Sequence, residues 1–244
     1  MSKTVFVAGA SGVIGLPLCK MLLDAGYNVV GTTRSAEKAA KLAEMGVKPV
    51  VLDVFDAQAV EQAMMAVKPD IVQHQLTDLP DGLKAEEMAT ALVRNARIRD
   101  EGTRNLVQAA QKAGVKKLVA QSIGFVYAPS EQIHTEDSPL LDFNEPTYGE
   151  TAKAVHSLEQ QTLNSGMAGV VLRNGWLYGA NSGIAEPVDF APPLHVHAAA
   201  LAAFLAIDVP AGIYNVADLD PRLDSQKFRR QCPQWSSEFR INAA

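Results

Sequence analysis

The sequence predicts a doubly wound α/β fold built on a mainly parallel β-sheet. Three observations support this prediction. Short apolar segments rich in β-branched residues alternate with helical stretches along most of the chain, which is typical of a parallel sheet covered by helices on both faces. The first strand–helix junction holds a glycine-rich turn. The chain has 244 residues, of which 48% are hydrophobic and 20% charged, so it can bury a full core.

The first third of the chain alternates regularly between strands and helices. Residues 4–8 are continuously apolar, as expected of a strand buried on both faces. Gly26 and Gly46 follow two of the helical stretches, at positions where a left-handed residue commonly ends a helix. We expect strands at 4–8, 27–32, 48–53 and 69–74, and helices at 15–25, 36–45 and 58–67.

The rest of the chain continues the alternation less regularly. A long helix is expected over residues 85–113, broken or bent inside and ended by Gly114. After it we expect a strand at 117–122, a polar loop at 124–147, a helix at 150–165, a strand at 170–173, a helix at 197–206 and a strand at 213–216. The last two dozen residues receive no assignment. We predict one NAD(P)-binding domain over residues 1–244, in which residues from about 179 to 244 form a small C-terminal substrate lobe.

Composition narrows the possible partners. The net charge of −5 offers no basic field for nucleic acid. No apolar run reaches the roughly 20 residues of a membrane helix, and residues 1–4 lead straight into a strand, so we expect a cytoplasmic protein without a signal peptide. Cys19 and Cys232 lie far apart and are expected to be reduced thiols, and we expect no metal site.

The glycine-rich turn predicts a site for the pyrophosphate of NAD(P). It places backbone N–H groups at a helix N-terminus, where the helix dipole also favours an anion. Gly9 permits the tight turn, Gly12 lets the backbone approach the phosphates, and Gly15 allows close packing of helix on strand. The residues predicted to bind the pyrophosphate are Gly9, Ser11, Gly12, Val13, Ile14 and Gly15.

Residues at the ends of the second, third and fourth predicted strands bear on how the cofactor binds and on whether it is NAD or NADP. A ribose 2′-hydroxyl is usually bound there by a carboxylate, whereas a 2′-phosphate needs a cation. Arg34 is the charged residue at the end of the second strand, which favours NADP over NAD. Asp53 is predicted to bind the adenine amino group, and an equally good alternative is that it caps a turn. Gln75 follows the fourth strand and either faces the cofactor or makes ordinary loop hydrogen bonds.

Several segments together resemble the short-chain dehydrogenase/reductase superfamily. They are the glycine turn, Arg34, Asp53, residues 101–110, the strand ending at Ser122, residues 172–179 and residues 211–216. More narrowly, residues 3–218 resemble its extended and atypical branch, the NAD-dependent epimerase/dehydratase type. The resemblance implies a Rossmann-type fold, and a homodimer formed through helices.

The resemblance also implies the catalytic residues Ser122, Tyr148 and Lys153. In that family the tyrosine exchanges a proton with the substrate oxygen, the lysine lowers the pKa of the phenol, and the serine holds the oxyanion. Here Ala152 stands four residues after Tyr148 and the lysine five, which turns the two side chains about 140° apart on a regular helix. Either Tyr148 precedes the first helical turn, or a π-bulge absorbs one residue, or the pair is lost.

Two functions remain open on these residues. The first is an oxidoreductase or epimerase that acts on the hydroxyl or carbonyl group of a small molecule. The second is a non-catalytic NADP(H)-binding sensor or scaffold, because the lysine is displaced. Trp176 and Tyr178 either wall the substrate pocket or pack inside the C-terminal lobe. Arg99 stands where the family often has asparagine.

Overall fold

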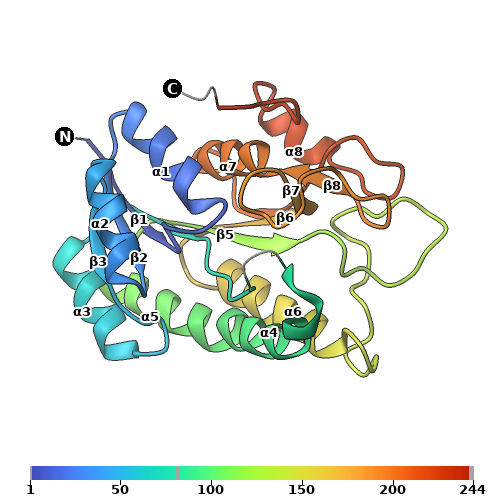
Figure 1. Ribbon diagram of the computed structural model, residues 1–244, viewed down its shortest axis with the longest axis horizontal. Coiled ribbons are helices and arrows are strands. Elements are labelled where there is room, and N and C mark those ends of the chain that lie inside the picture. The colour runs from blue at the N-terminus through green and yellow to red at the C-terminus, as the bar shows by residue number, and fades with distance from the viewer. Residues whose placement is uncertain (1, 81–82, 242–244) are drawn as a thin grey trace.

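The computed structural model describes residues 2–80 and 83–241 and contains a seven-stranded parallel sheet (Figure 1). The strands are β1 Thr4–Ala8, β2 Asn28–Thr33, β3 Lys48–Val51, β4 Ile71–His74, β5 Lys117–Ile123, β6 Ala168–Asn174 and β9 Gly212–Val216. Their order in space is β3-β2-β1-β4-β5-β6-β9, and it changes direction between β1 and β4. That pair is therefore the switch point at which such sheets bind ligands. The predicted doubly wound parallel fold is confirmed.

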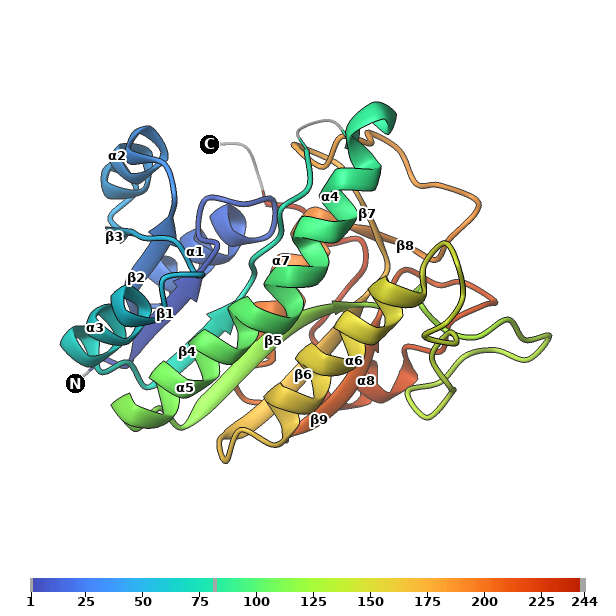
Figure 2. The same ribbon diagram turned by 90° about the horizontal axis from the view of Figure 1, so that it is seen from below.

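Helices cover both faces of the sheet (Figures 1 and 2). They are α1 Gly15–Asp24, α2 Ala36–Glu44, α3 Ala57–Val67, α4 Ala85–Arg97, α5 Thr103–Ala113, α6 Gly149–Leu163, α7 Val196–Leu205 and α8 Gln226–Gln231. α1 and α7 contact each other and share one buried apolar cluster, which includes Leu18 and Ala199. α3 and α5 cover the other face, with Met64 and Leu106 in a second cluster. The sheet is therefore packed between two apolar clusters.

The long helix predicted over residues 85–113 contains the expected break. A π-helical turn, Ile98–Gly102, separates α4 from α5. Gly102 fits closely there, because a Cβ atom on it would lie 3.2 Å from a side-chain carbon of Val54. The turn packs against α6, on the side of the sheet that Figure 2 shows in front.

The segment predicted as a C-terminal lobe is integrated with the main sheet. The short strands β7 (Trp176–Tyr178) and β8 (Pro193–His195) pair with each other, and neither was predicted. β9 pairs with β6 at the edge of the large sheet, and α7 packs on α1. Residues beyond Gly179 therefore complete both the sheet and one helical layer. Within the described ranges, none of the helices has the length and apolar character needed to cross a bilayer.

Candidate functional site

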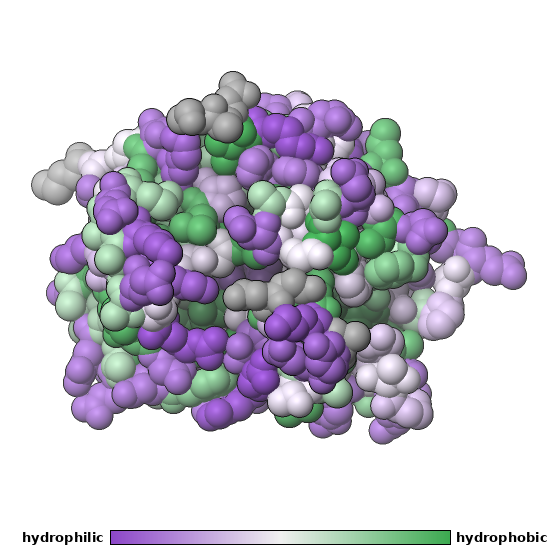
Figure 3. Space-filling view, in the orientation of Figure 1, coloured by the Kyte–Doolittle hydropathy of each residue, from purple (hydrophilic) through white to green (hydrophobic). Residues whose placement is uncertain are grey.

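A cleft of about 1220 Å³ lies at the carboxyl ends of β1, β2 and β4, next to the switch point. Its walls come from stretches within residues 8–17, 32–41, 52–55, 75–79 and 179–185, with further contributions from Ile98, Leu106, Val196 and His197. Figure 3 shows this face hollowed near its centre. The volume exceeds the range of about 300–1,000 Å³ that is usual for drug-sized ligands, as a dinucleotide requires.

The glycine turn between β1 and α1 is packed too closely to accept side chains. Gly9 has a φ of +85°, and a Cβ atom on it would lie 2.7 Å from the carbonyl oxygen of Gln75. A Cβ atom on Gly15 would lie 2.1 Å from the carbonyl oxygen of Gly9. Both contacts are with backbone, which cannot move aside easily. The turn is thus held against β4 on one side and against its own helix on the other.

The same turn presents backbone donors at the start of α1. The N–H groups of Val13 and Ile14 have no hydrogen-bond acceptor among the described residues. Ser11, Gly12 and Val13 line the cleft, whereas Ile14 is buried behind them. Unpaired N–H groups at a helix N-terminus favour a bound anion. Five of the six predicted pyrophosphate residues thus lie in the cleft wall or supply these donors, and Gly15 supports the turn from behind.

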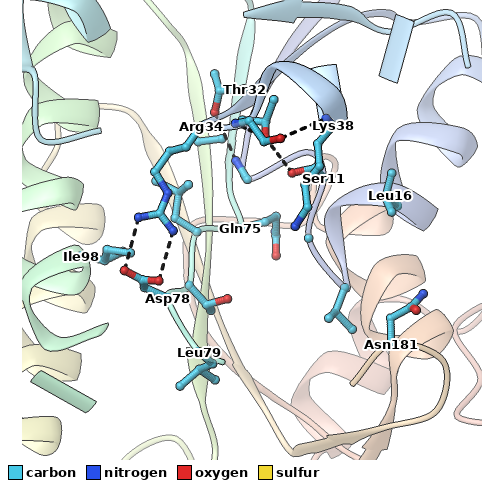
Figure 4. A pocket seen from close by; sticks show the side chains of 18 of the residues that line it. Ser11, Leu16, Thr32, Arg34, Lys38, Gln75, Asp78, Leu79, Ile98 and Asn181 are labelled. Carbon is cyan, nitrogen blue, oxygen red and sulfur yellow. Dashed lines mark hydrogen bonds and ion pairs between the residues drawn. The ribbon is translucent and has the colours of Figure 1, made fainter. Parts of the chain in front are cut away.

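Arg34 reaches across one end of the cleft to Asp78, in the loop after β4 (Figure 4). Its Nη1 and Nη2 atoms lie 3.3 and 3.1 Å from the two carboxylate oxygens. Arg94 of α4 contacts the same carboxylate at 3.3 Å, so Asp78 holds two arginines. Its hydrogen bond to Asp78 raises the pKa of Arg34. Lys38 lines the cleft as well, four residues after Arg34, so two cationic side chains belong to its wall.

Asp53 and Gln75 both lie in the cleft wall. The Oδ1 atom of Asp53 accepts the N–H of Phe55 at 3.0 Å, so this carboxylate does cap a turn, while its position still allows contact with a ligand. The amide nitrogen of Gln75 donates to the Oε1 atom of Gln73 at 3.1 Å. The Oε1 atom of Gln75 is buried and has no partner among the described residues. A buried oxygen of this kind favours a ligand that donates a hydrogen bond.

The opposite wall contains Asn181 and His197 (Figure 4 labels Asn181). Asn181 has a φ of +63°, a left-handed conformation that asparagine tolerates. The Nδ1 atom of His197 accepts the N–H of Ile241, and that of His195 accepts the N–H of His197. In the part of the chain that the structure describes, no three histidine, cysteine or acidic side chains form a metal-binding group.

Ser122 is buried and is not among the residues that line the cleft. Its hydroxyl donates to the Oε1 atom of Glu159 in α6, at 2.9 Å. Arg173 in β6 binds both oxygens of Glu159, at 2.8 and 2.7 Å, and also donates to the hydroxyl of Tyr127. Burial lowers the pKa of Arg173, but its bonds to Glu159 outweigh burial and raise it. In this arrangement the hydroxyl of Ser122 is part of a buried ionic network.

Tyr148 and Lys153 are not brought together with Ser122. Tyr148 is the N-cap residue of α6 with a φ of −126°, so it does precede the first helical turn, and it is 53% exposed. α6 continues as a regular α-helix without a π-bulge. The ammonium group of Lys153 lies 3.8 Å from the carboxylate of Glu150, and its side chain is 63% exposed. Ala152 fills the helix position that faces the interior and is fully buried.

A different cation lies on the inner side of this helical layer. Arg99, in the π-helical turn, has its pKa lowered to about 10 by burial, although the nearby charge of Glu159 opposes this effect. His74, at the end of β4, is fully buried, and burial together with the charge of Arg99 lowers its pKa to about 4. Its ring Nε2 atom pairs with the hydroxyl of Thr103 at 2.9 Å. The histidine is therefore neutral near pH 7.

Sequence reasoning missed several polar residues of the cleft wall, among them Lys38, Asp78 and Asn181. Lys38 carries a weak signal, since it stands one helical turn after Arg34 on the helix that follows β2. Asn181 lies beside two glycines in a turn-forming stretch. Asp78 carries no local signal, because its partner Arg34 is 44 residues away.

Comparisons with known proteins identify the family of this chain. A model of the NAD dependent epimerase/dehydratase family matches residues 5–216. The chain is similar to a 3-diazoavenalumate denitrifying reductase from a Streptomyces species, with 40% identity over 217 residues, which cover 85% of this chain and 69% of the relative. It is also similar to a putative NADPH-dependent methylglyoxal reductase from Candida albicans, with 35% identity over 133 residues, which cover 50% of this chain and 38% of that protein.

A solved structure shares the fold over nearly the whole chain. The UDP-glucose 4-epimerase of Thermus thermophilus, in complex with NAD, matches this chain with a TM-score of 0.74 at 22% identity. The match covers 98% of this chain and 95% of the epimerase chain. At this identity the likeness concerns the fold, while the family match rests on the sequence. This chain belongs to the NAD-dependent epimerase/dehydratase family.

Proposed function

We propose that this protein is a reductase that uses NADP(H) in preference to NAD(H) and acts on a small carbonyl-type substrate. The observation that carries the proposal is the cleft itself. It has unpaired N–H groups from a glycine turn, and Arg34 and Lys38 line it on the side where Ser11 of that turn bonds Thr33. Two relatives, 40% and 35% identical, are named as reductases, and the second as NADPH-dependent, which supports this direction.

The residues present fit the dinucleotide. The amides of Val13 and Ile14 would hold the pyrophosphate. Arg34 would hold the 2′-phosphate through paired N–H donors, a geometry that suits phosphate oxygens. The unpartnered oxygen of Gln75 would accept a hydrogen bond from the bound cofactor. When bound, the cofactor supplies a hydride.

Tyr148 is the proposed proton donor. Reduction of a carbonyl takes the hydride at carbon and one proton at oxygen, and the phenol of Tyr148 would supply that proton. Neither Ser122 nor Lys153 assists directly in the observed arrangement, because each is bound to a glutamate. Arg99, a partly buried cation in the π-helical turn that packs against α6, would stabilise negative charge on the substrate oxygen.

The contacts of Ser122 with Glu159 and of Lys153 with Glu150 favour a second candidate function. A protein that has lost the serine and lysine contributions would bind NADP(H) without transferring hydride and would act as a sensor or scaffold. The two candidates differ in turnover and agree in cofactor binding, so they can be separated by kinetics.

NADPH oxidation by the wild-type protein, followed at 340 nm with a panel of small aldehydes, ketones and dicarbonyls, tests the proposal. We expect turnover with at least one class, and we expect Tyr148→Phe to lower kcat by about 100-fold or more with little effect on NADPH affinity, since general acid catalysis contributes about 10²–10⁴-fold. Tight NADPH binding without oxidation of any member would favour the sensor. Unchanged turnover in Tyr148→Phe would remove Tyr148 as the donor.

Cofactor preference is expected to depend on Arg34. Arg34→Gln should weaken NADPH binding by about 10- to 100-fold, the effect of losing charge-assisted hydrogen bonds, and should change NADH binding less than about threefold. Asp78→Asn should tighten NADPH binding, because Asp78 competes for the same guanidinium. Fluorescence titration of each variant with NADPH and with NADH measures these affinities. The matched controls are Arg104→Gln and Asp24→Asn, which break the exposed ion pairs Arg104–Asp100 and Lys20–Asp24 outside the cleft. Equal losses for NADPH and NADH would contradict the assignment.

A cytoplasmic location and a homodimer complete the proposal. Both cysteines are buried free thiols, which suits a reducing compartment. Sedimentation velocity of the purified protein would test the dimer.

A further inference from the structure

Three aromatic side chains gather beyond the carboxyl ends of β5 and β6. They are Phe125, just after β5, Trp176, the first residue of β7, and Phe190, between β7 and β8; we call them the aromatic trio. The ring centroids of Phe125 and Trp176 lie 4.9 Å apart at an angle of 46°, and those of Trp176 and Phe190 lie 5.0 Å apart at 79°. Phe125 is 38% exposed and Phe190 64% exposed. The trio therefore offers open ring surface to a ligand.

The trio is held in place by backbone contacts on each side. The N–H of Trp176 donates to the carbonyl of Pro192 at 2.7 Å, and the N–H of Gly124 donates to the carbonyl of Asn174 at 2.7 Å. A Cβ atom on Gly175 would lie 2.6 Å from the oxygen of Pro192, so the two segments are in direct backbone contact. The rings are thus carried by paired or tightly packed chain rather than by a free loop.

An arginine fixes the chain next to Phe190. The Nη1 atom of Arg222 donates to the carbonyl oxygen of Asp189 at 2.7 Å. The same guanidinium is bound by Asp220 through two contacts, at 2.9 and 2.7 Å. An exposed aromatic ring whose backbone is anchored in this way is pre-ordered, so a ligand loses less affinity to ordering it.

The chain that carries Trp176 and Phe190 also forms part of the cofactor cleft. The β7–β8 connection lines the cleft with residues 179–185 and then carries Phe190. β7 is three residues long, so about 10 Å of extended chain separates Trp176 from the cleft residue Gly179. In Figure 3 hydrophobic surface lies immediately to the right of the central hollow, on the side where Figure 1 places β7 and β8. A small ligand could touch both.

We infer that the aromatic trio is a substrate subsite that binds a planar aromatic ring. The inference rests on the proposed function, since it assigns the substrate class of that reductase. Rings paired in tilted and edge-to-face geometry leave some π faces and ring edges open, and a further aromatic ring can pack against them in the same geometries. An alkyl group of equal area lacks this attraction. The carbonyl group of such a substrate would point along β7 toward the cleft.

Binding of benzoate and of cyclohexanecarboxylate to the NADP⁺-saturated protein tests the subsite. The two probes have the same charge and nearly the same size, they are inert to hydride transfer, and only benzoate is planar. Calorimetry is expected to show benzoate binding at least tenfold more tightly. Emission from Trp176 should change on binding, because the second tryptophan, Trp235, is buried with its indole N–H bound to a carbonyl.

Phe190→Ala and Trp176→Leu are each expected to lower the ratio of benzoate affinity to cyclohexanecarboxylate affinity by at least tenfold. Phe143→Ala is the control, because Phe143 is 40% exposed and lies outside the trio. Equal affinity for the two probes, or an unchanged preference in both trio variants, would overturn the subsite. So would a change from dimer to monomer in Phe190→Ala, which would assign the trio to a contact between copies.

Failure of the subsite and failure of the proposed function give different results. A protein that oxidises NADPH but treats the two probes alike is a reductase without this subsite. A protein that prefers benzoate and does not oxidise NADPH keeps the aromatic site and loses the reductase assignment.

Discussion

Replacing Gly9 with alanine is expected to abolish detectable cofactor binding. The new methyl group would lie 2.7 Å from the carbonyl oxygen of Gln75 and 2.9 Å from its carbonyl carbon, so the turn would have to move away from β4. The position also has a φ of +85°, which L side chains disfavour. Displacing the turn moves the N–H groups of Val13 and Ile14, and we expect NADPH affinity to fall by 100-fold or more in a fluorescence titration.

Gly26→Ala is the matched control for this effect. Gly26 has nearly the same backbone conformation, with a φ of +81°, but nothing lies within 4 Å of a Cβ atom built on it. The Gly26→Ala variant should lose about 1 kcal/mol of stability, the cost of a side chain at a positive φ. Its NADPH affinity should be unchanged. If both variants bind NADPH equally well, the close approach of turn and strand is not what forms the site.

The parts of the site that the sequence predicts are those formed by neighbours along the chain. The glycine turn follows from a strand, three glycines and a helix within a dozen residues, and the observed turn has the expected place. Arg34 is found in the cleft because a strand end fixes its position. The strands β7 and β8 escape prediction because each is only three residues long, too short to show a periodic pattern.

The parts that cannot be predicted depend on contacts between distant segments. Ser122 has the position expected of a catalytic serine, but its partner Glu159 comes from a helix 37 residues later. Arg34 finds Asp78 across 44 residues. The direction in which a buried polar side chain points depends on which charges the fold brings near it, and a local pattern does not contain that information.

This buried ionic network leads to the second large effect, on stability. Glu159 and Arg173 have side chains that are only 2% and 5% exposed. Glu159→Leu leaves the guanidinium of Arg173 buried without a counter-charge and leaves Ser122 without its acceptor. We expect a loss of about 3–5 kcal/mol in the free energy of unfolding, the usual cost of breaking a buried pair from one side. Urea denaturation followed by circular dichroism measures it.

Two comparisons separate charge burial from loss of packing. In the double variant Glu159→Leu with Arg173→Met, the charge of Arg173 is gone as well, and much of the lost stability should return, because, of the two buried arginines near Glu159, only Arg99 still lacks that counter-charge. Glu61→Leu breaks an ion pair with Lys112 whose side chains are 42% and 59% exposed, and it should cost less than about 1 kcal/mol. If the double variant is no more stable than Glu159→Leu, loss of packing rather than the stranded charge of Arg173 accounts for the effect. In that case the side chain of Glu159 stabilises the contact between α6 and β6 mainly by packing, and its hydrogen bond to Ser122 is a consequence of that packing.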